Sequence, residues 1–312
     1  MSILHSIVFR SINSKKQSYD TKCPKDYPAI RLKEIEDNKR AVAPKSINIK
    51  NMKWNGVEVE ELRNTINPKE KIIFYIHGGG FTMGSVRTRR AFTGYVVSKL
   101  GYNVLAVEYR LAPEHPFPAA PTDCLSVYCE LLNFYDPKNI VIMGESAGGN
   151  LVLSTLLQIK NNGLPQPVAA ICIAPCVQFD KTLPSYTKNV LTDAMLTNLS
   201  EEVLDTYLQS RDLKLAKNPL FAPYYGDFTG CPPIYLWASE SEVLLDDSVI
   251  LYEKLKKAGH PCNLYLRKKM MHTWMIVPYF RESKKDLSRM KTHLQDAYNG
   301  VFNEENEPIH LK

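Results

Sequence analysis

Short apolar runs alternate with longer, helix-like stretches from about residue 70 onwards. The runs are apolar on both faces, which is typical of strands covered on both sides of a parallel sheet. The expected strands are Ile72–Ile76, Val104–Val107, Ile140–Met143, Val168–Ala174, Ile234–Ala238 and Leu264–Leu266, preceded by strand signals at Ser46–Ile49 and Val57–Leu62. The expected helices lie near residues 87–99, 120–134, 147–161, 247–258 and 279–297. This alternation predicts an α/β fold with a mostly parallel central sheet flanked by helices.

Two regions depart from this alternation. Residues 1–45 are helical in composition, polar and rich in lysine, and residues 178–225 form a connection too long for an ordinary link between a helix and a strand. The second region contains helix-like sequence at 199–210. Long insertions in a compact domain often cover a site. We therefore expect a helical cap, built from both regions, and a catalytic domain that spans residues 46–312.

The helix expected at 247–258 has recognisable ends. Asp246 or Asp247 is expected as its N-cap, because a carboxylate accepts a hydrogen bond from a free N–H group of the first turn. Gly259 is expected to end the helix, since glycine readily adopts the left-handed conformation found at helix C-termini.

The composition is that of an ordinary globular protein. Of 312 residues, 44% are hydrophobic and 23% are charged. The net charge of +6 is modest and the basic residues are scattered among acidic ones, so we expect no nucleic-acid partner. No stretch approaches the roughly 20 consecutive apolar residues of a membrane helix, so we expect no stable membrane insertion.

The N-terminal residues and the cysteines indicate in which cellular compartment the protein is expected. Residues Met1–Phe9 lack a convincing small-residue cleavage site, so a signal peptide is not expected. Residues 2–12 are interpreted as a short amphipathic helix that packs on the body of the protein rather than on a membrane or a partner. The seven cysteines have no repeated spacing, and Cys172 and Cys176 lack companions for a zinc site. Buried thiols in a reducing compartment, and hence a cytoplasmic protein, are expected.

Glycine is concentrated around one serine, in the segment GESAGGN at residues 144–150. Each glycine loses more backbone freedom on folding than any other residue, so such a cluster needs a structural reason. The segment follows an apolar strand and precedes an apolar helix, and G-x-S-x-G at such a junction is typical of a nucleophile elbow. We expect Ser146 to occupy a strained turn, with its hydroxyl exposed at a helix N-terminus whose dipole favours negative charge.

A second glycine cluster, His77-Gly78-Gly79-Gly80, ends another expected strand. Three consecutive glycines leave backbone N–H groups uncovered and able to bind an anion. A phosphate-binding loop is the alternative, but neither G-x-x-x-x-G-K-[ST] nor G-x-G-x-x-G spacing is present. We therefore expect these amides to stabilise the oxyanion of an acyl-transfer intermediate.

Two further segments, YRLAPEHPFPAA at 109–120 and ESEVLLDD at 240–247 with a histidine after it, complete a set of motifs. With them the chain closely resembles the hormone-sensitive-lipase-like branch of the α/β-hydrolase fold, over roughly residues 45 to 300 and in matching order. The resemblance implies hydrolysis of a small-molecule carboxylic ester through an acyl-enzyme, without a metal or cofactor.

The resemblance also implies roles for individual residues. Ser146 is implied as the nucleophile. The backbone amides of Gly79, Gly80 and Ala147 are implied to form the oxyanion hole, with Gly78 shaping the loop.

The general base must be a histidine, because a serine hydroxyl loses its proton as it attacks. His272 follows the last expected strand, and the chain order serine, acid, histidine of these hydrolases requires a late histidine. The other six lie in the termini, in or beside expected surface helices, or beside other motifs: His5, His77, His115, His260, His293 and His310. Family members often have glycine and an aromatic residue after this histidine. Here Thr273 and Trp274 follow, which leaves the width of the substrate pocket open.

The acid is placed by alignment with the family pattern of aspartate, proline, leucine and an acidic pair. This implies Glu242 as the group that orients the imidazole, with Glu240 at the strand end as the alternative. Four residues of the second motif are expected to hold the glycine loop and the elbow in register by buried charge pairing, without acting on substrate: Tyr109, Arg110, Glu114 and Asp123.

Other functions stay open on the sequence alone. The same residues serve amide, carbamate or lactone hydrolysis, and a non-catalytic receptor of this fold would lack His272. An interfacial lipase would need a long apolar lid, so small soluble esters with short acyl chains are the favoured substrates. A homodimer is a further expectation.

Overall fold

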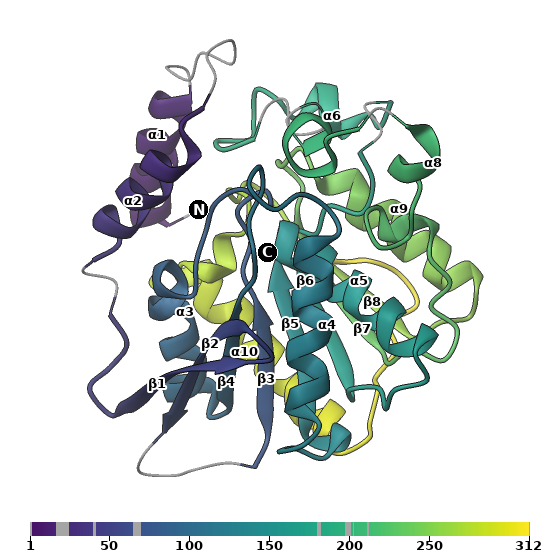
Figure 1. Cartoon of the computed structure of the whole chain (residues 1–312). Helices are drawn as coiled ribbons and strands as arrows, with labels where there is room; N and C mark the ends of the chain where they lie inside the picture. Colours follow the sequence, from purple (N-terminus) through teal and green to yellow (C-terminus); the bar gives the residue numbers. More distant parts are fainter. Residues whose placement is uncertain are drawn as a thin grey trace.

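One mixed sheet forms the centre of the molecule (Figure 1). The computed structural model describes residues 2–16, 25–39, 42–64, 70–179, 182–196, 201, 203–210 and 212–311. Within these residues, nine strands are ordered β1-β2-β4-β3-β5-β6-β7-β8-β9. β2 runs antiparallel to both neighbours, and the other strand pairs are parallel. The predicted α/β fold with a mostly parallel sheet is confirmed.

The strands lie close to where the apolar runs predict them. They are β1 (Ile47–Trp54), β2 (Val57–Asn64), β3 (Ile72–Ile76), β4 (Asn103–Glu108), β5 (Ile140–Glu145), β6 (Ala169–Ile173), β7 (Ile234–Ser239), β8 (Cys262–Arg267) and β9 (Ile309–Leu311). The last of these has no counterpart among the expected strands, because its three residues are too short for a recognisable pattern.

The helices expected near 120–134, 147–161, 247–258 and 279–297 are present with ends shifted by a few residues. The stretch expected at 87–99 is divided into three short pieces, and two short helices in the described part of residues 178–225 have no counterpart among the expected helices. The helices are α1 (Ile3–Lys16), α2 (Tyr27–Asp37), α3 (Arg90–Tyr95), α4 (Ala119–Leu131), α5 (Ala147–Asn161), α6 (Ser185–Lys188), α8 (Leu213–Ala216), α9 (Leu245–Lys257) and α10 (Arg281–Tyr298). Shorter turns include η1 (Arg87–Arg89), η2 (Val96–Leu100), η4 (Leu204–Leu208) and η5 (Pro223–Tyr225). None of the helices in the described residues is long and apolar enough to cross a membrane.

Each face of the sheet has its own apolar core. Alternate side chains of a strand point to opposite faces, and β3 divides accordingly. Phe74 joins the core under α4, α5 and α9, whereas Tyr75 joins the core under α3 and α10. The strands are therefore apolar on both sides because helices cover both sides, as the sequence pattern predicts.

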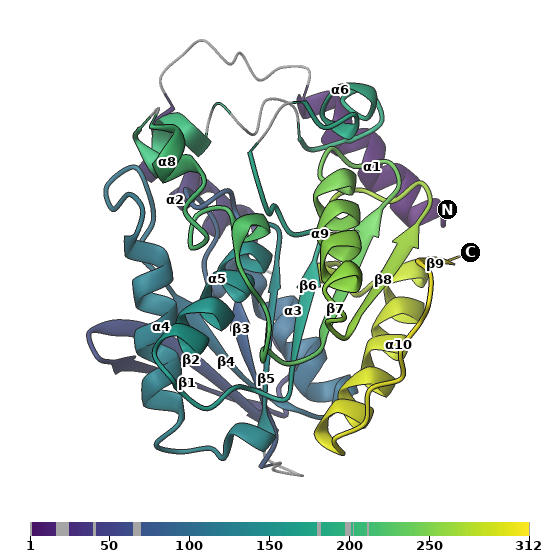
Figure 2. The ribbon, with the colours of Figure 1, turned by 90° about the vertical axis from the view of Figure 1, so that its right-hand side faces the viewer.

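The two regions outside the alternation lie at one end of the sheet. Figures 1 and 2 show α1, α2, α6 and α8 gathered beyond the same end of the strands. Of the helix-like sequence at 199–210, the described residues contain the single turn η4, and residues 197–200, 202 and 211 lie outside the described part. The division into a cap and a catalytic domain at residues 45 and 46 stays a prediction.

One helix end differs from the expectation. The N-cap of α9 is Leu244, so the prediction of Asp246 or Asp247 at this position was wrong. Both aspartates lie in the first turn and accept hydrogen bonds from other segments, Asp246 from the amide of Ser185 and Asp247 from two amides that follow β6. Gly259 has a φ of +68° just beyond the helix, which confirms the predicted C-terminal end.

Candidate active site

Ser146 lies at the sharp turn between β5 and α5. Its φ of +55° and ψ of −122° are rarely adopted by a residue with a side chain, and its amide donates to the carbonyl of Ile173 at 2.8 Å. A Cβ atom on Gly144 would lie 2.4 Å from the carbonyl oxygen of Gly148, and one on Gly148 would lie 2.1 Å from that of Ile76. The glycines around Ser146 are therefore required by the close approach of β5, α5 and β3.

His272 links the serine to a carboxylate. Its Nε2 atom lies 2.8 Å from Oγ of Ser146, and its Nδ1 atom lies 2.6 Å from Oε2 of Glu242. Glu242 follows β7, and its Oε1 atom accepts a hydrogen bond from the amide of Ser239 at 2.7 Å. The histidine is 3% exposed and the glutamate is fully buried. The three residues expected to act together are thus brought together from the ends of β5, β7 and β8.

The charges of this pair are set by opposing effects. Burial on its own would lower the pKa of His272, but the hydrogen bond and the negative charge of Glu242 outweigh it, so the pKa lies above its usual value of 6.5. Burial raises the pKa of Glu242, while its hydrogen bonds from His272 and Ser239 act in the other direction. The imidazole is therefore held with a tendency to take up a proton, as a general base requires.

The alternative acid, Glu240, does not contact His272. Its carboxylate lies 2.7 Å from Nδ1 of His310 and 3.9 Å from Nζ of Lys268. The structure therefore gives Glu242, and not Glu240, as the carboxylate hydrogen-bonded to the imidazole.

The glycine loop after β3 has an unusual backbone. Gly79 and Gly80 have φ angles of +126° and +62°, and a Cβ atom on Gly79 would lie 2.2 Å from the carbonyl oxygen of Met83. In the described part of the chain, the N–H groups of Gly79, Gly80 and Ala147 have no hydrogen-bond acceptor. Gly78 differs, because its amide donates to Oε1 of Glu145 at 2.7 Å. Three of the four expected residues therefore have uncommitted donors, and Gly78 is fixed within the loop.

The side chains of His77 and Tyr109 pack against each other at the start of the glycine loop. Burial lowers the pKa of His77 to about 3, so its ring is neutral. The two rings stack with centroids 4.3 Å apart, and the hydroxyl of Tyr109 donates to the carbonyl of His77 at 2.8 Å. These contacts agree with the supporting role expected for Tyr109, and His77 takes part in them.

The charged residues of the second motif are paired, but less deeply than expected. Arg110 forms a double hydrogen bond with Asp123, yet half of the Arg110 side chain is exposed. Glu114 is also partly exposed and pairs with Arg31 of α2. The expectation of buried charge pairing was therefore correct for the Asp123 carboxylate and wrong for Arg110 and Glu114.

Two supporting residues were missed by the sequence reasoning. Arg89 donates to Oε1 of Glu145 at 2.8 Å, and Glu145 directly precedes the serine. His5, set aside as a terminal residue, is buried, and its Nε2 atom accepts a hydrogen bond from the amide of Met271 at 3.3 Å. Neither residue belongs to a motif, so no local sequence signal identifies it.

An aromatic cluster lies beside the glycine loop and the start of α5. Phe81, which follows Gly80, stacks on Tyr207 with ring centroids 3.9 Å apart and planes within 2°. Phe117, Phe179 and Phe221 surround this pair. The side chain of Asn150, one turn after Ser146, donates to the carbonyl of Phe221, which attaches the cluster to the elbow helix.

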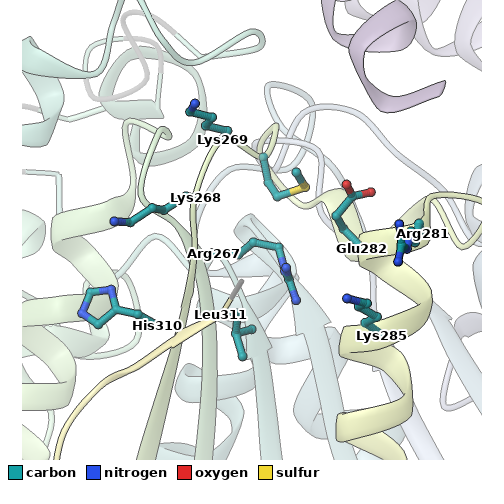
Figure 3. Close-up of a pocket in the computed structure, with 9 residues that line it drawn as sticks. Arg267, Lys268, Lys269, Arg281, Glu282, Lys285, His310 and Leu311 are labelled. Atoms are coloured by element: carbon teal, nitrogen blue, oxygen red, sulfur yellow. The ribbon is translucent and has the colours of Figure 1, made fainter. Parts of the chain in front are cut away.

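A cavity of 520 Å³ lies elsewhere, between β8, β9 and the first turns of α10 (Figure 3). Its lining is rich in basic side chains, among them Lys269, Arg281 and Lys285, and contains none of the expected site residues. No cluster of His, Cys, Asp and Glu residues suited to a metal occurs among the residues that the structure describes.

Comparisons with known sequences agree with the fold. A family model described as an alpha/beta hydrolase fold matches residues 73–276. An acetyl-hydrolase of Streptomyces hygroscopicus is 32% identical over 206 residues, which cover 65% of this chain and 68% of that protein. An esterase of Acinetobacter venetianus is 31% identical over 245 residues, which cover 78% of this chain and 80% of that protein.

Solved structures resemble almost the whole chain. The crystal structure of EstE5 soaked with p-nitrophenyl butyrate has a TM-score of 0.88 and 30% identity, and covers 96% of this chain and 100% of its own. An esterase from the bacterial hormone-sensitive lipase family has a TM-score of 0.87 and 29% identity, with 96% and 99% covered. The chain therefore belongs to the α/β-hydrolase family, in its hormone-sensitive-lipase-like branch.

Proposed function

We propose that this protein is a serine carboxylesterase that hydrolyses small esters with short acyl chains through an acyl-enzyme. The observation that carries the proposal is the continuous hydrogen-bonded path from Ser146 through His272 to Glu242, at 2.8 and 2.6 Å. Beside it lie backbone amides that have no acceptor among the described residues. Relatives named esterase and acetyl-hydrolase support the same reaction class.

In the first half of the proposed reaction, Oγ of Ser146 attacks the ester carbonyl carbon while Nε2 of His272 takes the hydroxyl proton. The carbonyl oxygen becomes an oxyanion, which accepts hydrogen bonds from the amides of Gly79, Gly80 and Ala147. The carbon–oxygen bond to the alcohol then breaks, and the alcohol leaves with the proton held on Nε2. An acyl group remains on the serine.

In the second half, water replaces the alcohol. Nε2 of His272 takes a proton from the water as its oxygen attacks the acyl carbon, and the same amides stabilise the second oxyanion. The acid leaves as Oγ of Ser146 regains its proton. Throughout, Glu242 holds the imidazole in one orientation and stabilises its protonated form.

The preference for short acyl chains is supported by the aromatic cluster. Phe81 and Tyr207 are fully buried and stacked beside the loop that carries the proposed oxyanion amides. We propose that this stacked pair limits the length of the acyl chain that Ser146 accepts. A solved relative was soaked with p-nitrophenyl butyrate, an ester with a short acyl chain.

The proposal is tested with a series of p-nitrophenyl esters from acetyl to dodecanoyl, hydrolysed by wild type and Ser146→Ala. Wild type should be fastest on the short chains, and the variant should be slower by about 10⁴-fold or more, because no neighbouring group replaces the nucleophile. Both proteins should melt at similar temperatures. Near-normal turnover by the variant, or no turnover by wild type on any chain length, contradicts the proposal.

A further inference from the structure

The glycine loop needs support from outside itself. Four residues between 79 and 84 have positive φ angles: Gly79, Gly80, Phe81 and Gly84. A glycine-rich backbone has many alternative conformations of similar energy, so contacts with neighbouring segments determine which one is populated. The start of the loop is held by the hydrogen bond from the Gly78 amide to the carboxylate of Glu145. The end of the loop, from Thr82 to Gly84, contacts the N-terminal helix α2.

The guanidinium of Arg31, on α2, donates hydrogen bonds to two backbone carbonyl groups, one of which lies in the glycine loop. Its Nε atom donates to the carbonyl of Thr82 at 2.7 Å, and its Nη2 atom donates to that of Ala112 at 2.6 Å. The amide of Ala112 in turn donates to the carbonyl of Phe81 at 2.9 Å. Two bonds to Glu114, at 2.9 and 2.8 Å, orient the guanidinium. Arg31 thus joins the glycine loop to the segment that follows β4.

Glu34 lies one turn further along α2 and holds the end of the loop. Its Oε2 atom accepts a hydrogen bond from the amide of Gly84 at 2.9 Å. Its Oε1 atom lies 3.3 Å from Nη1 of Arg89, whose Nε atom donates to Glu145 at 2.8 Å. An alternating chain of charges therefore leads from α2 to the residue that precedes Ser146.

We propose that Arg31 and Glu34 are positioning residues, which hold the amides of Gly79 and Gly80 where the oxyanion forms. The inference rests on the proposed function and extends the machinery to a helix outside the segment matched by the family model, which begins at residue 73. Neither side chain touches the reacting atoms. Each acts on the loop through a backbone hydrogen bond, Arg31 at Thr82 and Glu34 at Gly84.

A positioning role differs from a stabilising role in what it changes. A displaced oxyanion donor weakens binding of the transition state and leaves binding of the substrate nearly unchanged. The expected signature is a lower kcat with an unchanged KM. A trifluoromethyl ketone, which forms a tetrahedral oxyanion adduct with an active serine, reports the same change as a weaker inhibition constant.

The test compares Arg31→Gln and Glu34→Ala with wild type on a short-chain p-nitrophenyl ester. Alanine removes the oxygen that accepts the hydrogen bond from the Gly84 amide. Removing a whole oxyanion donor typically costs about 10²–10³ in rate, and misplacing one costs less. We expect each variant to lose about tenfold in kcat and about tenfold in trifluoromethyl ketone affinity. KM should stay within about twofold of wild type.

Two further variants complete the design. Lys33→Gln removes a positive charge from an exposed position of the same helix, and it should match wild type in every constant. Arg31→Lys keeps the charge but replaces a planar fork by a single ammonium group, so it should restore only part of the lost kcat. If Arg31→Gln does not fold, Glu34→Ala and Arg31→Lys provide the same readouts.

The outcomes are distinguishable. A lower kcat with matched loss of inhibitor affinity, absent in Lys33→Gln, supports the positioning role. Folded Arg31→Gln and Glu34→Ala with wild-type kcat and inhibitor affinity overturn it, whatever their melting temperatures. Wild type that hydrolyses no ester overturns the proposed function and this inference together, whereas active wild type with unaffected variants overturns the inference alone.

Discussion

Nδ1 of His272 lies 2.6 Å from Oε2 of Glu242, and both side chains are buried. A histidine ring has two nitrogens, and the hydrogen bond made by one determines what the other can do. With Nδ1 donating to the carboxylate, Nε2 is left as the acceptor that faces Oγ of Ser146. The relationship between these two residues therefore fixes both the orientation of the proposed base and its proton affinity.

Glu242→Gln should lower kcat by about 10³–10⁴-fold, because an amide favours the wrong tautomer of the imidazole. Glu240→Gln is the matched control, since this carboxylate pairs with His310 and Lys268 at the surface. We expect the control to stay within about twofold of wild type, as exposed ion pairs contribute little. Steady-state kinetics on one short-chain ester measure the loss of kcat in each variant. Equal losses in the two variants would contradict the assignment of Glu242.

The pH dependence of kcat/KM should report the protonation of His272. The base acts only when neutral, so the rate should rise with pH through the pKa of His272, which Glu242 raises above 6.5. In Glu242→Gln the negative charge is lost, so burial lowers the pKa of His272. The residual activity should therefore rise at a lower pH than in wild type. An identical rising limb in both proteins would show that Glu242 does not set this pKa.

Much of this site was predictable because its chemistry is local in the sequence. Gly144, Ser146 and Gly148 are close neighbours in the chain, and the close approach that requires glycine occurs within the same turn. The order of the strands places the acid and the base after β7 and β8, at the same end of the sheet. Short-range geometry and the order along the chain therefore carried the assignment of Ser146 and His272 as candidates, whereas Glu242 was assigned through the resemblance to the family pattern.

Tyr207→Ala should shift the preference towards longer acyl chains. Removing the ring opens space beside Phe81, so the ratio of kcat/KM for octanoyl to that for butyryl esters should rise about tenfold, within the range that one pocket contact supplies. The variant should also lose about 3–5 kcal/mol of stability, because a large buried side chain is deleted. Tyr225→Ala, at a partly exposed tyrosine of η5, is the control and should leave the ratio unchanged. If Tyr207→Ala keeps the wild-type chain-length profile, the stacked pair of Phe81 and Tyr207 does not determine the acyl-chain preference.

Asp247 should make stability depend on pH. Burial raises the pKa of its carboxyl to about 7 in the folded protein, far above its value in an unfolded chain. A group with a raised folded pKa contributes stability below its unfolded pKa and loses it as pH rises through the folded pKa, here between about 4 and 7.

Asp247→Asn removes this titration and keeps an oxygen for the amides of Val177 and Gln178. Burial also raises the pKa of Glu108 to about 7, but that group is present in both proteins and cancels in the comparison. Relative to wild type, the free energy of unfolding of Asp247→Asn should therefore increase as pH rises from 4 to 7, by up to about 1.4 kcal/mol per pH unit. Chemical denaturation at several pH values measures this difference. A difference that is constant with pH would contradict the assignment.

The parts that were not predictable depend on contacts between distant segments. Arg31 and Glu34 look like ordinary charged residues of a helix, and their role follows only from the placement of α2 against the glycine loop. His5 reaches the loop of the proposed base from the first helix. The error at Asp247 has the same origin, since the helix begins two residues earlier and the carboxylate serves amides beyond β6.

The identity of the nucleophile is tested most directly by covalent labelling. A fluorophosphonate forms a stable ester with an activated serine, and mass spectrometry locates the modified residue. We expect one adduct per chain, on Ser146, with activity lost in proportion to labelling and no adduct in Ser146→Ala. Labelling of another residue with loss of activity, or full ester hydrolysis by protein labelled at Ser146, would contradict it.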